Sequence, residues 1–248
     1  MVARTRVAEA VSLSLALLAC ESTPILLYHS VGEPWDGSRW VSSEELRLEL
    51  LDLLASGYEP ITASELDGIE DGTIPSPRQP ILITFDDGFQ NFHDHAYPVL
   101  KELGIKSTMF LISGRVRTST SAAGAPAYLS WEEVDALKKD GVEMQSHTVT
   151  HRRLRGLDDA EIEAELRDSR SEIERQLGVD VTVIAYPFGS ESPRIEAIAA
   201  RAGYRSGHSV ESGLGGRFGR QRVSIHHGDG PEAVRAALRP TWWGEVRE

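Results

Sequence analysis

Short apolar runs alternate along the chain with longer amphipathic stretches. The runs that predict β-strands span residues 25–28, 81–85, 108–112, 142–145, 181–186 and 223–225. Several are apolar throughout, which is typical of parallel strands that are covered on both faces. Strands that alternate with helices over this length favour an α/β barrel or a doubly wound sheet, in which a functional site lies at the carboxyl ends of the strands.

The predicted helices carry recognisable start and stop signals. Ser42 with Glu45, and Ser130 with Glu133, have the spacing of a capping box, while Ser192 stands before a proline at a first helical position. The stretch 158–177 gathers its apolar residues on one helical face, which predicts an outer helix packed on a sheet. Glycines that follow amphipathic stretches predict helix ends at positions 57, 104, 141, 178 and 203.

Composition narrows the classes of protein. The 248 residues, 40% of them hydrophobic, suit one α/β domain of barrel size. The net charge of -12 gives little support to a nucleic-acid or anionic-membrane partner and favours an uncharged or cationic substrate. A local basic patch depends on the fold, which the net charge does not describe. The single cysteine, Cys20, excludes an intramolecular disulfide within this sequence.

The first twenty residues carry a separate signal. Arg4 and Arg6 precede an apolar run over residues 10–19, and the following Cys20 completes a segment that resembles a signal peptide with a lipid-anchored cysteine. The alternatives are an amphipathic helix or a start codon placed too far upstream. Export would place the protein in the cell envelope or outside the cell, and the alternatives leave it in the cytoplasm. The run is shorter than the roughly 20 residues that cross a bilayer, so we expect no permanent membrane span.

Two polar motifs follow predicted strands. In Thr84-Phe85-Asp86-Asp87-Gly88, one carboxylate can bind a cation while its neighbour remains free as a base. In residues 147–151, His147 and His151 have the spacing that places two imidazoles on one side of a helical turn. Together with Asp87 they predict a three-ligand metal site with open positions, as in catalytic metal centres. Each motif alone is more often a turn or an incidental pair.

Two weaker motifs also follow strands. His29 comes directly after the first strand, and Tyr186-Pro187-Phe188 follows the strand at 181–186. By themselves, His29 is equally consistent with a loop histidine whose ring is bound by the backbone, and the aromatic motif with a simple turn.

Taken together, these residues resemble the polysaccharide deacetylases of carbohydrate esterase family 4, also called the NodB homology domain. The resemblance implies a single-domain, distorted (β/α) barrel over residues 23–240, between an extension at 1–22 and a tail at 241–248. It also implies that Asp86 is the general base, and that Asp87, His147 and His151 bind the metal. The early position of His29 resembles a permuted subgroup that includes enzymes of poly-N-acetylglucosamine biosynthesis, and there it implies the catalytic acid. His226 and His227 are the competing candidates for that role.

One family feature is missing. The family's Arg-x-Pro-Tyr motif aligns with residues 185–188, so the arginine that orients the base is replaced by alanine, and Arg222 is a candidate substitute. The resemblance implies that the Phe188 N–H contacts the oxyanion, with Pro187 and Tyr186 beside the substrate.

The implied reaction is removal of N-acetyl groups from a glycan that contains N-acetylglucosamine. Two imidazoles and a carboxylate favour zinc, and cobalt, nickel or iron can use the same ligands. The alternatives are an O-acetyl esterase or small-amide hydrolase with the same metal site, or a carbohydrate-binding protein that has lost catalysis. We expect an N-acetylated glycan as partner and no nucleic acid. The oligomeric state and the identity of the glycan stay open.

Overall fold

The computed structural model describes residues 23–32, 39–117, 127–210 and 213–238. The predicted extension at 1–22, with Cys20, and the tail at 241–248 lie outside the described residues. No helix in the described part of the chain is both long enough and apolar enough to span a membrane.

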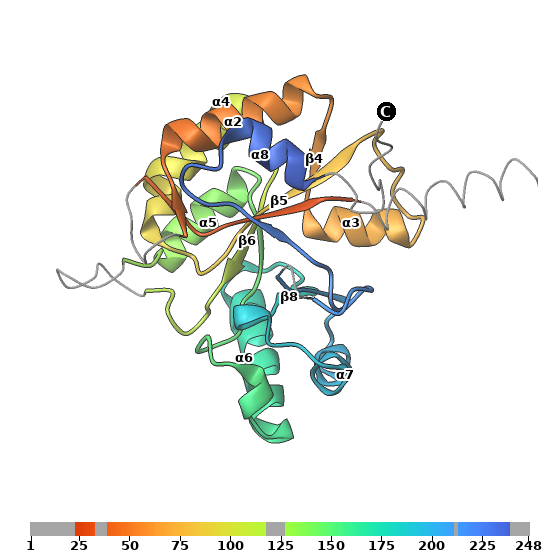
Figure 1. Ribbon diagram of the computed structural model, residues 1–248. Helices are drawn as coiled ribbons and strands as arrows, with labels where there is room; N and C mark the ends of the chain where they lie inside the picture. The colour runs from red at the N-terminus through yellow and green to blue at the C-terminus, as the bar shows by residue number, and fades with distance from the viewer. Residues whose placement is uncertain (1–22, 33–38, 118–126, 211–212, 239–248) are drawn as a thin grey trace, which may run out of the picture.

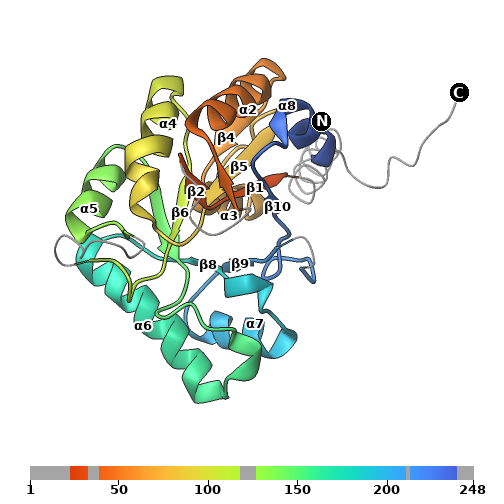
Figure 2. The ribbon, with the colours of Figure 1, turned by 60° about the vertical axis from the view of Figure 1, so that its left-hand side comes forward.

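A parallel β-sheet forms the centre of the fold. Its strands run in the order β10-β1-β5-β6-β7-β8-β9, and the short β4 pairs with the first half of β5. Every described pair in this sheet is parallel, and the sheet curls into an open barrel (Figures 1 and 2), which confirms the predicted fold class. The strands are β1 (Ile25–Tyr28), β4 (Glu59–Ile61), β5 (Pro80–Phe85), β6 (Thr108–Leu111), β7 (Glu143–Ser146), β8 (Val183–Ala185), β9 (Ser206–His208) and β10 (Val223–Ser224). A separate small sheet pairs β2 (Ser30–Val31) with β3 (Trp40–Val41).

Helices cover the outside of the sheet, and α4, α5, α6 and α7 surround it in Figure 2. The α-helices are α2 (Ser43–Ala55), α3 (Ala63–Glu70), α4 (Tyr97–Leu103), α5 (Trp131–Lys139), α6 (Asp159–Leu177), α7 (Pro193–Arg201) and α8 (Gly230–Ala237). The shorter turns are η1 (Phe92–Ala96), η2 (Leu154–Gly156) and η3 (Pro187–Gly189). The capping boxes at Ser42 and Ser130, and the cap at Ser192, form as predicted, and Gly104 and Gly178 end their helices in the left-handed conformation.

Side chains that alternate along the strands build two apolar layers. Those pointing outward meet the covering helices, so Ile83 and Met109 share a core with Ile162 and Leu166 of α6. Those pointing inward form a smaller cluster with α3, whose apolar face therefore fills part of the barrel's interior. This inner cluster contains Ile25, Ile61, Ala63, Leu66, Ile69, Leu82, Phe110, Val183 and Ala185.

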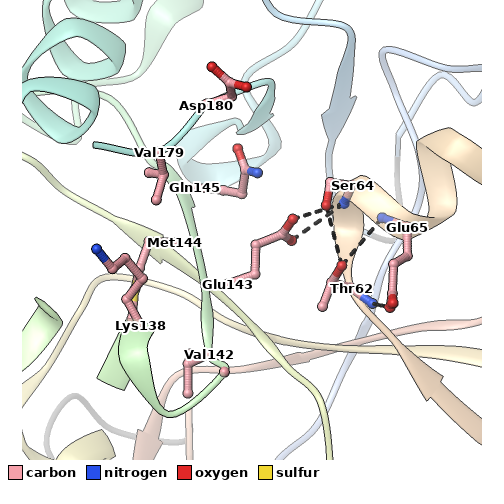
Figure 3. Close-up of a pocket in the computed structure, with 11 residues that line it drawn as sticks. Thr62, Ser64, Glu65, Lys138, Val142, Glu143, Met144, Gln145, Val179 and Asp180 are labelled. Atoms are coloured by element: carbon pink, nitrogen blue, oxygen red, sulfur yellow. Dashed lines mark hydrogen bonds between the residues drawn. The ribbon is translucent and has the colours of Figure 1, made fainter. Parts of the chain in front are cut away.

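The start of β7 borders a hollow of about 420 Å³ (Figure 3). There the Glu143 carboxylate accepts hydrogen bonds from the backbone N–H groups of Ala63 and Ser64, at the beginning of α3. The Gln145 side chain accepts from the N–H groups of residues 182 and 183, so it bridges β7 and β8 where their backbones separate. Because residues that precede β7 line this hollow, it lies at the opposite end of the sheet from the polar motifs, which follow the strands.

Candidate functional site

The candidate site residues follow the carboxyl ends of four strands of the parallel sheet. His29 follows β1, Asp86 and Asp87 follow β5, His147 follows β7, and residues 186–188 follow β8. These groups border one cavity of about 310 Å³. Its lining consists of Leu27, His29, Arg39, Asp86, Asp87, His147, His151, Arg153, Tyr186, Phe188, Val210, Arg222, Ser224 and His226. The structure therefore brings the sequence-predicted residues together, except that Pro187 is buried and is not among the lining residues.

Asp87, His147 and His151 converge as the ligand prediction requires. The Nε2 atoms of His147 and His151 lie 3.6 and 3.4 Å from Oδ1 of Asp87, and all three ligand atoms lie within 4.8 Å of one another. Burial is the main cause that lowers the pKa of both histidines, to about 3 for His151. Both imidazoles are therefore neutral at pH 7, which is the form that binds a metal ion.

A second contact fixes the tautomer of His147. Its Nδ1 lies 2.7 Å from the carbonyl oxygen of Ala185, and because a carbonyl only accepts, Nδ1 carries the proton. The lone pair of Nε2 is then directed toward Asp87. Histidine ligands of metal sites are commonly held in this way by a backbone carbonyl. The donor set, its spacing and this tautomer all fit one divalent cation.

The backbone between the two histidines differs from the sequence prediction. A helical turn was expected there, and that prediction is wrong, because Thr148 and His151 have φ angles of 67° and 64°, in the left-handed region. The loop is instead held by Glu165 of α6, which accepts hydrogen bonds from the N–H groups of Val149 and Thr150 at 3.0 and 2.9 Å. Glu165 was missed in the sequence, although an acidic residue on the apolar face of a predicted helix is a usable signal.

Left-handed backbone conformation is concentrated at this cavity. Among the described residues other than glycine, positive φ angles occur at Asp87, Thr148, His151 and Phe188. Three of these border the cavity, and Thr148 lies between two ligands. Such conformations cost on the order of 1–3 kcal/mol each and cluster at functional sites. The fold therefore holds these residues in conformations that serve the geometry of the site.

Arg222 binds the carboxylate of Asp86 on both of its oxygens. The Nη1–Oδ1 and Nη2–Oδ2 distances are both 2.7 Å, and the Arg222 side chain is 1% exposed. Nε donates to the carbonyl of Ser209, and Nη1 reaches Thr84. Burial raises the pKa of Asp86, but the charges and hydrogen bonds of Arg222, together with His147, lower it well below its ordinary value. Asp86 is thus ionised and fixed in orientation.

His29 lines the same cavity as Asp86. Burial is the largest cause that lowers its pKa to about 4, the charge of Asp86 opposes this shift, and Arg222 and Arg39 add to it. Of the competing histidines, His226 also borders the cavity. His227 is not among the lining residues, because it stacks on Trp40 and bonds to Glu45.

Phe188 lies at the mouth of the cavity in the short turn η3. The residue is 40% exposed, and its ring contacts the His151 ring, with the centroids 4.6 Å apart. The guanidinium of Arg153 lies over the Phe188 ring, with Cζ 4.3 Å from the centroid. Arg39 and Arg153, which both line the cavity, were not singled out in the sequence, where nothing separates them from other surface arginines.

Comparisons with known proteins agree with this geometry. A family model described as polysaccharide deacetylase matches residues 73–207. The protein YxkH of Bacillus subtilis (strain 168), named for the same family, is 30% identical over 219 residues, which cover 87% of this chain and 75% of YxkH. The poly-beta-1,6-N-acetyl-D-glucosamine N-deacetylase of Staphylococcus aureus (strain N315) is 26% identical over 144 residues, which cover 54% of this chain and 49% of that protein.

A solved structure extends the likeness. The Streptococcus pyogenes deacetylase PplD, in complex with acetate, superposes with a TM-score of 0.79 at 26% identity, covering 88% of this chain and 98% of PplD. The family match contains both aspartates, both ligand histidines and Phe188, whereas His29 and Arg222 lie outside it. On this match, and on the likeness to YxkH over most of both proteins, the chain belongs to the polysaccharide deacetylase family.

Proposed function

We propose that the protein is a metal-dependent hydrolase that removes N-acetyl groups from a glycan containing N-acetylglucosamine and releases acetate. One observation carries the proposal: a group of three ligands, Asp87, His147 and His151, lies beside an ionised carboxylate, Asp86, in a cavity that His29 also lines. The Staphylococcus aureus relative is named for N-deacetylation of poly-N-acetylglucosamine, which supports the N-acetyl group as the target.

The ligand set favours zinc. Two neutral imidazoles and one carboxylate suit this ion, and three protein ligands leave positions open for water and substrate. A bound divalent cation supplies Lewis-acid chemistry, which polarises the acetyl carbonyl and lowers the pKa of water from 15.7 to about 7. The remaining steps belong to the side chains of the protein.

Asp86 takes a proton from the attacking water. Its Oδ2 lies 3.6 Å from Nε2 of His147, so the carboxylate borders the ligand group without being part of it. Arg222 keeps Asp86 ionised and fixes the plane of its carboxylate. The low pKa of Asp86 keeps its carboxylate ionised at neutral pH, which is the form that accepts a proton.

His29 delivers a proton to the sugar nitrogen. With a pKa of about 4, its ring is neutral in the free protein at pH 7. Negative charge that develops on the acetyl group after the attack of water raises the pKa of a nearby imidazole. His29 can then accept the proton released at Asp86 and transfer it to the nitrogen, so the sugar departs as a neutral amine.

The backbone N–H of Phe188 is the proposed donor to the carbonyl oxygen as this atom gains charge. The backbone of Phe188 is held in the left-handed conformation at φ 57°, and its ring contacts the ring of His151. Loss of one such donor typically costs roughly 3 kcal/mol of transition-state stabilisation. Phenylalanine in place of the family tyrosine is compatible with this role, since the donor is a backbone group.

Acetate release tests the proposal. Zinc-loaded protein is incubated with N-acetylglucosamine oligomers, peptidoglycan, acetylated xylan and an O-acetylated ester, with and without a chelator. We expect release from N-acetylated glycans that the chelator abolishes and zinc restores. Asp86→Asn is expected to bind zinc and be inactive, and His227→Gln, outside the cavity, serves as the control. Release from the O-acetyl substrates alone, or full activity of Asp86→Asn, would refute the corresponding part of the proposal.

A further inference from the structure

The cavity is positively charged at its mouth, although the protein as a whole is acidic. Its lining includes Arg39, Arg153 and Arg222, and among the described residues the carboxylates in that lining are those of Asp86 and Asp87. Asp86 is neutralised by Arg222, and Asp87 belongs to the ligand group. Within the described residues, the charges of Arg39 and Arg153 are therefore uncompensated at the place where substrate must enter.

Arginines elsewhere on the described surface mostly have carboxylate partners. Examples are Arg47–Glu102, Arg152–Glu161, Arg175–Glu172, Arg194–Asp159, Arg205–Asp71 and Arg235–Asp52, whereas Arg78, Arg115, Arg155 and Arg201 are exceptions among the described residues, away from the lining of the cavity. In contrast, no carboxylate of the described part of the chain lies within 4.0 Å of the guanidinium of Arg39 or Arg153. Two cavity arginines that have no carboxylate partner in the described part of the chain are available to a ligand.

The two arginines flank different parts of the reaction centre. Arg153 lies over the Phe188 ring, and that ring contacts His151, so Arg153 is on the side of the acetyl group. Arg39 is close enough to His29 for its charge to act on that ring, so it is on the side of the leaving sugar nitrogen. Stacking on a ring leaves the N–H edge of a guanidinium available for a carboxylate or phosphate.

We propose that the substrate glycan is acidic, with a carboxylate or phosphodiester on the reacting sugar or its neighbour bound by Arg39 and Arg153. This inference rests on the proposed function, which it narrows. Each deacetylated sugar carries an amine that is protonated at pH 7, so a polymer of N-acetylglucosamine alone would bring accumulating positive charge to these arginines. An acidic polymer keeps the charge balanced as deacetylation proceeds.

The overall charge of -12 does not oppose this assignment. Charges separated by more than about 8 Å are largely screened at physiological ionic strength, so the local arginines outweigh the distant acidic surface. Composition favours an uncharged or cationic substrate for the protein as a whole, and the proposal of an acidic glycan departs from that expectation on the ground of the cavity's own charges.

Matched oligosaccharides test the inference. One N-acetylglucosamine-containing oligosaccharide carries a free carboxylate on the neighbouring sugar, a second carries its methyl ester, and a third carries a phosphodiester. The readout is the ratio of kcat/KM for each anionic substrate to that for the ester, from acetate release. We expect the wild type to prefer an anion, and Arg153→Gln or Arg39→Gln to lower this ratio roughly tenfold, equivalent to about 1.4 kcal/mol.

Arg78→Gln is the control, because Arg78 is exposed before β5, at the opposite end of the sheet, and loses the same charge. It should leave the ratio and the activity unchanged. A higher kcat/KM for the carboxylate than for the phosphodiester substrate, or the reverse, shows which of the two anionic groups the arginines bind. Equal rates for acid, phosphodiester and ester would overturn this inference and leave the proposed function standing. No acetate from any of the three would overturn both.

Discussion

Replacing Arg222 with glutamine should expose how the base is controlled. The change removes two charge-assisted hydrogen bonds of 2.7 Å and leaves the Asp86 carboxylate, which is 3% exposed, without its cation. Removing one partner of a buried ion pair typically destabilises a protein by about 3–5 kcal/mol. Because the native pKa of Asp86 lies below its unfolded value, the pair stabilises the fold fully at pH 7 and loses this effect only in strong acid.

The same substitution should change the pH dependence of catalysis. Without Arg222, burial becomes the dominant influence and raises the pKa of Asp86, so the base is protonated at higher pH. We expect the acid limb of the kcat/KM profile to lie at higher pH in Arg222→Gln than in the wild type. The variant should lose activity at pH 7 and regain part of it as the pH is raised above 7.

Urea unfolding at pH 7 and the pH–rate profile measure these two effects. Asp86→Asn supplies the reference, and Arg222→Gln should cost far less stability in the Asp86→Asn background than in the wild type, because the two charges are paired with each other. A loss of stability below about 0.5 kcal/mol for Arg222→Gln, the level of an ordinary surface change, combined with an unshifted acid limb would refute this reasoning.

Three further predictions follow from other contacts. Glu165→Ala should loosen the loop that carries His151 and weaken zinc binding by about 10–100-fold in a competition assay; unchanged affinity would mean that Glu165 does not position the ligands. His29→Ala should retain stoichiometric zinc and lose most of kcat, and normal turnover would shift the acid role to His226. Burial raises the pKa of Glu49 to about 7, above its ordinary 4.5, so its stabilising contribution is present below pH 4.5 and is lost as the pH rises through 7. Glu49→Gln, which keeps an acceptor for the Tyr28 hydroxyl, should therefore gain about 2–3 kcal/mol relative to the wild type between pH 5 and pH 9 in denaturant titrations; parallel pH profiles would contradict this.

The main strands were predictable because they are apolar and buried on both faces. β4 was missed because it contains an exposed Glu59 and a proline, and β9 because its residues, Ser206 to His208, are polar or glycine. β9 is buried nonetheless, and the hydroxyl of Ser206 is satisfied there because it donates a hydrogen bond to Asp67 of α3. Such a strand depends on distant partners, and a single sequence does not reveal them.

The candidate site was predictable where a catalytic or metal-binding residue comes directly after a strand. Asp86, Asp87 and His147 occupy the ends of buried strands, and parallel strands bring their carboxyl ends to one edge. The left-handed backbone at His151 was not predictable, because no glycine marks it. The pairing of Arg222 with Asp86 joins residues that are 136 positions apart, so sequence alone offered it only as a candidate.

The location of a bound metal ion tests the central claim most directly. Anomalous diffraction from crystals grown with zinc should show one ion per chain, about 2.0–2.2 Å from a carboxylate oxygen of Asp87 and from Nε2 of His147 and His151. An ion bound elsewhere, or a cavity that stays empty at saturating zinc while these three side chains remain in place, would contradict the account.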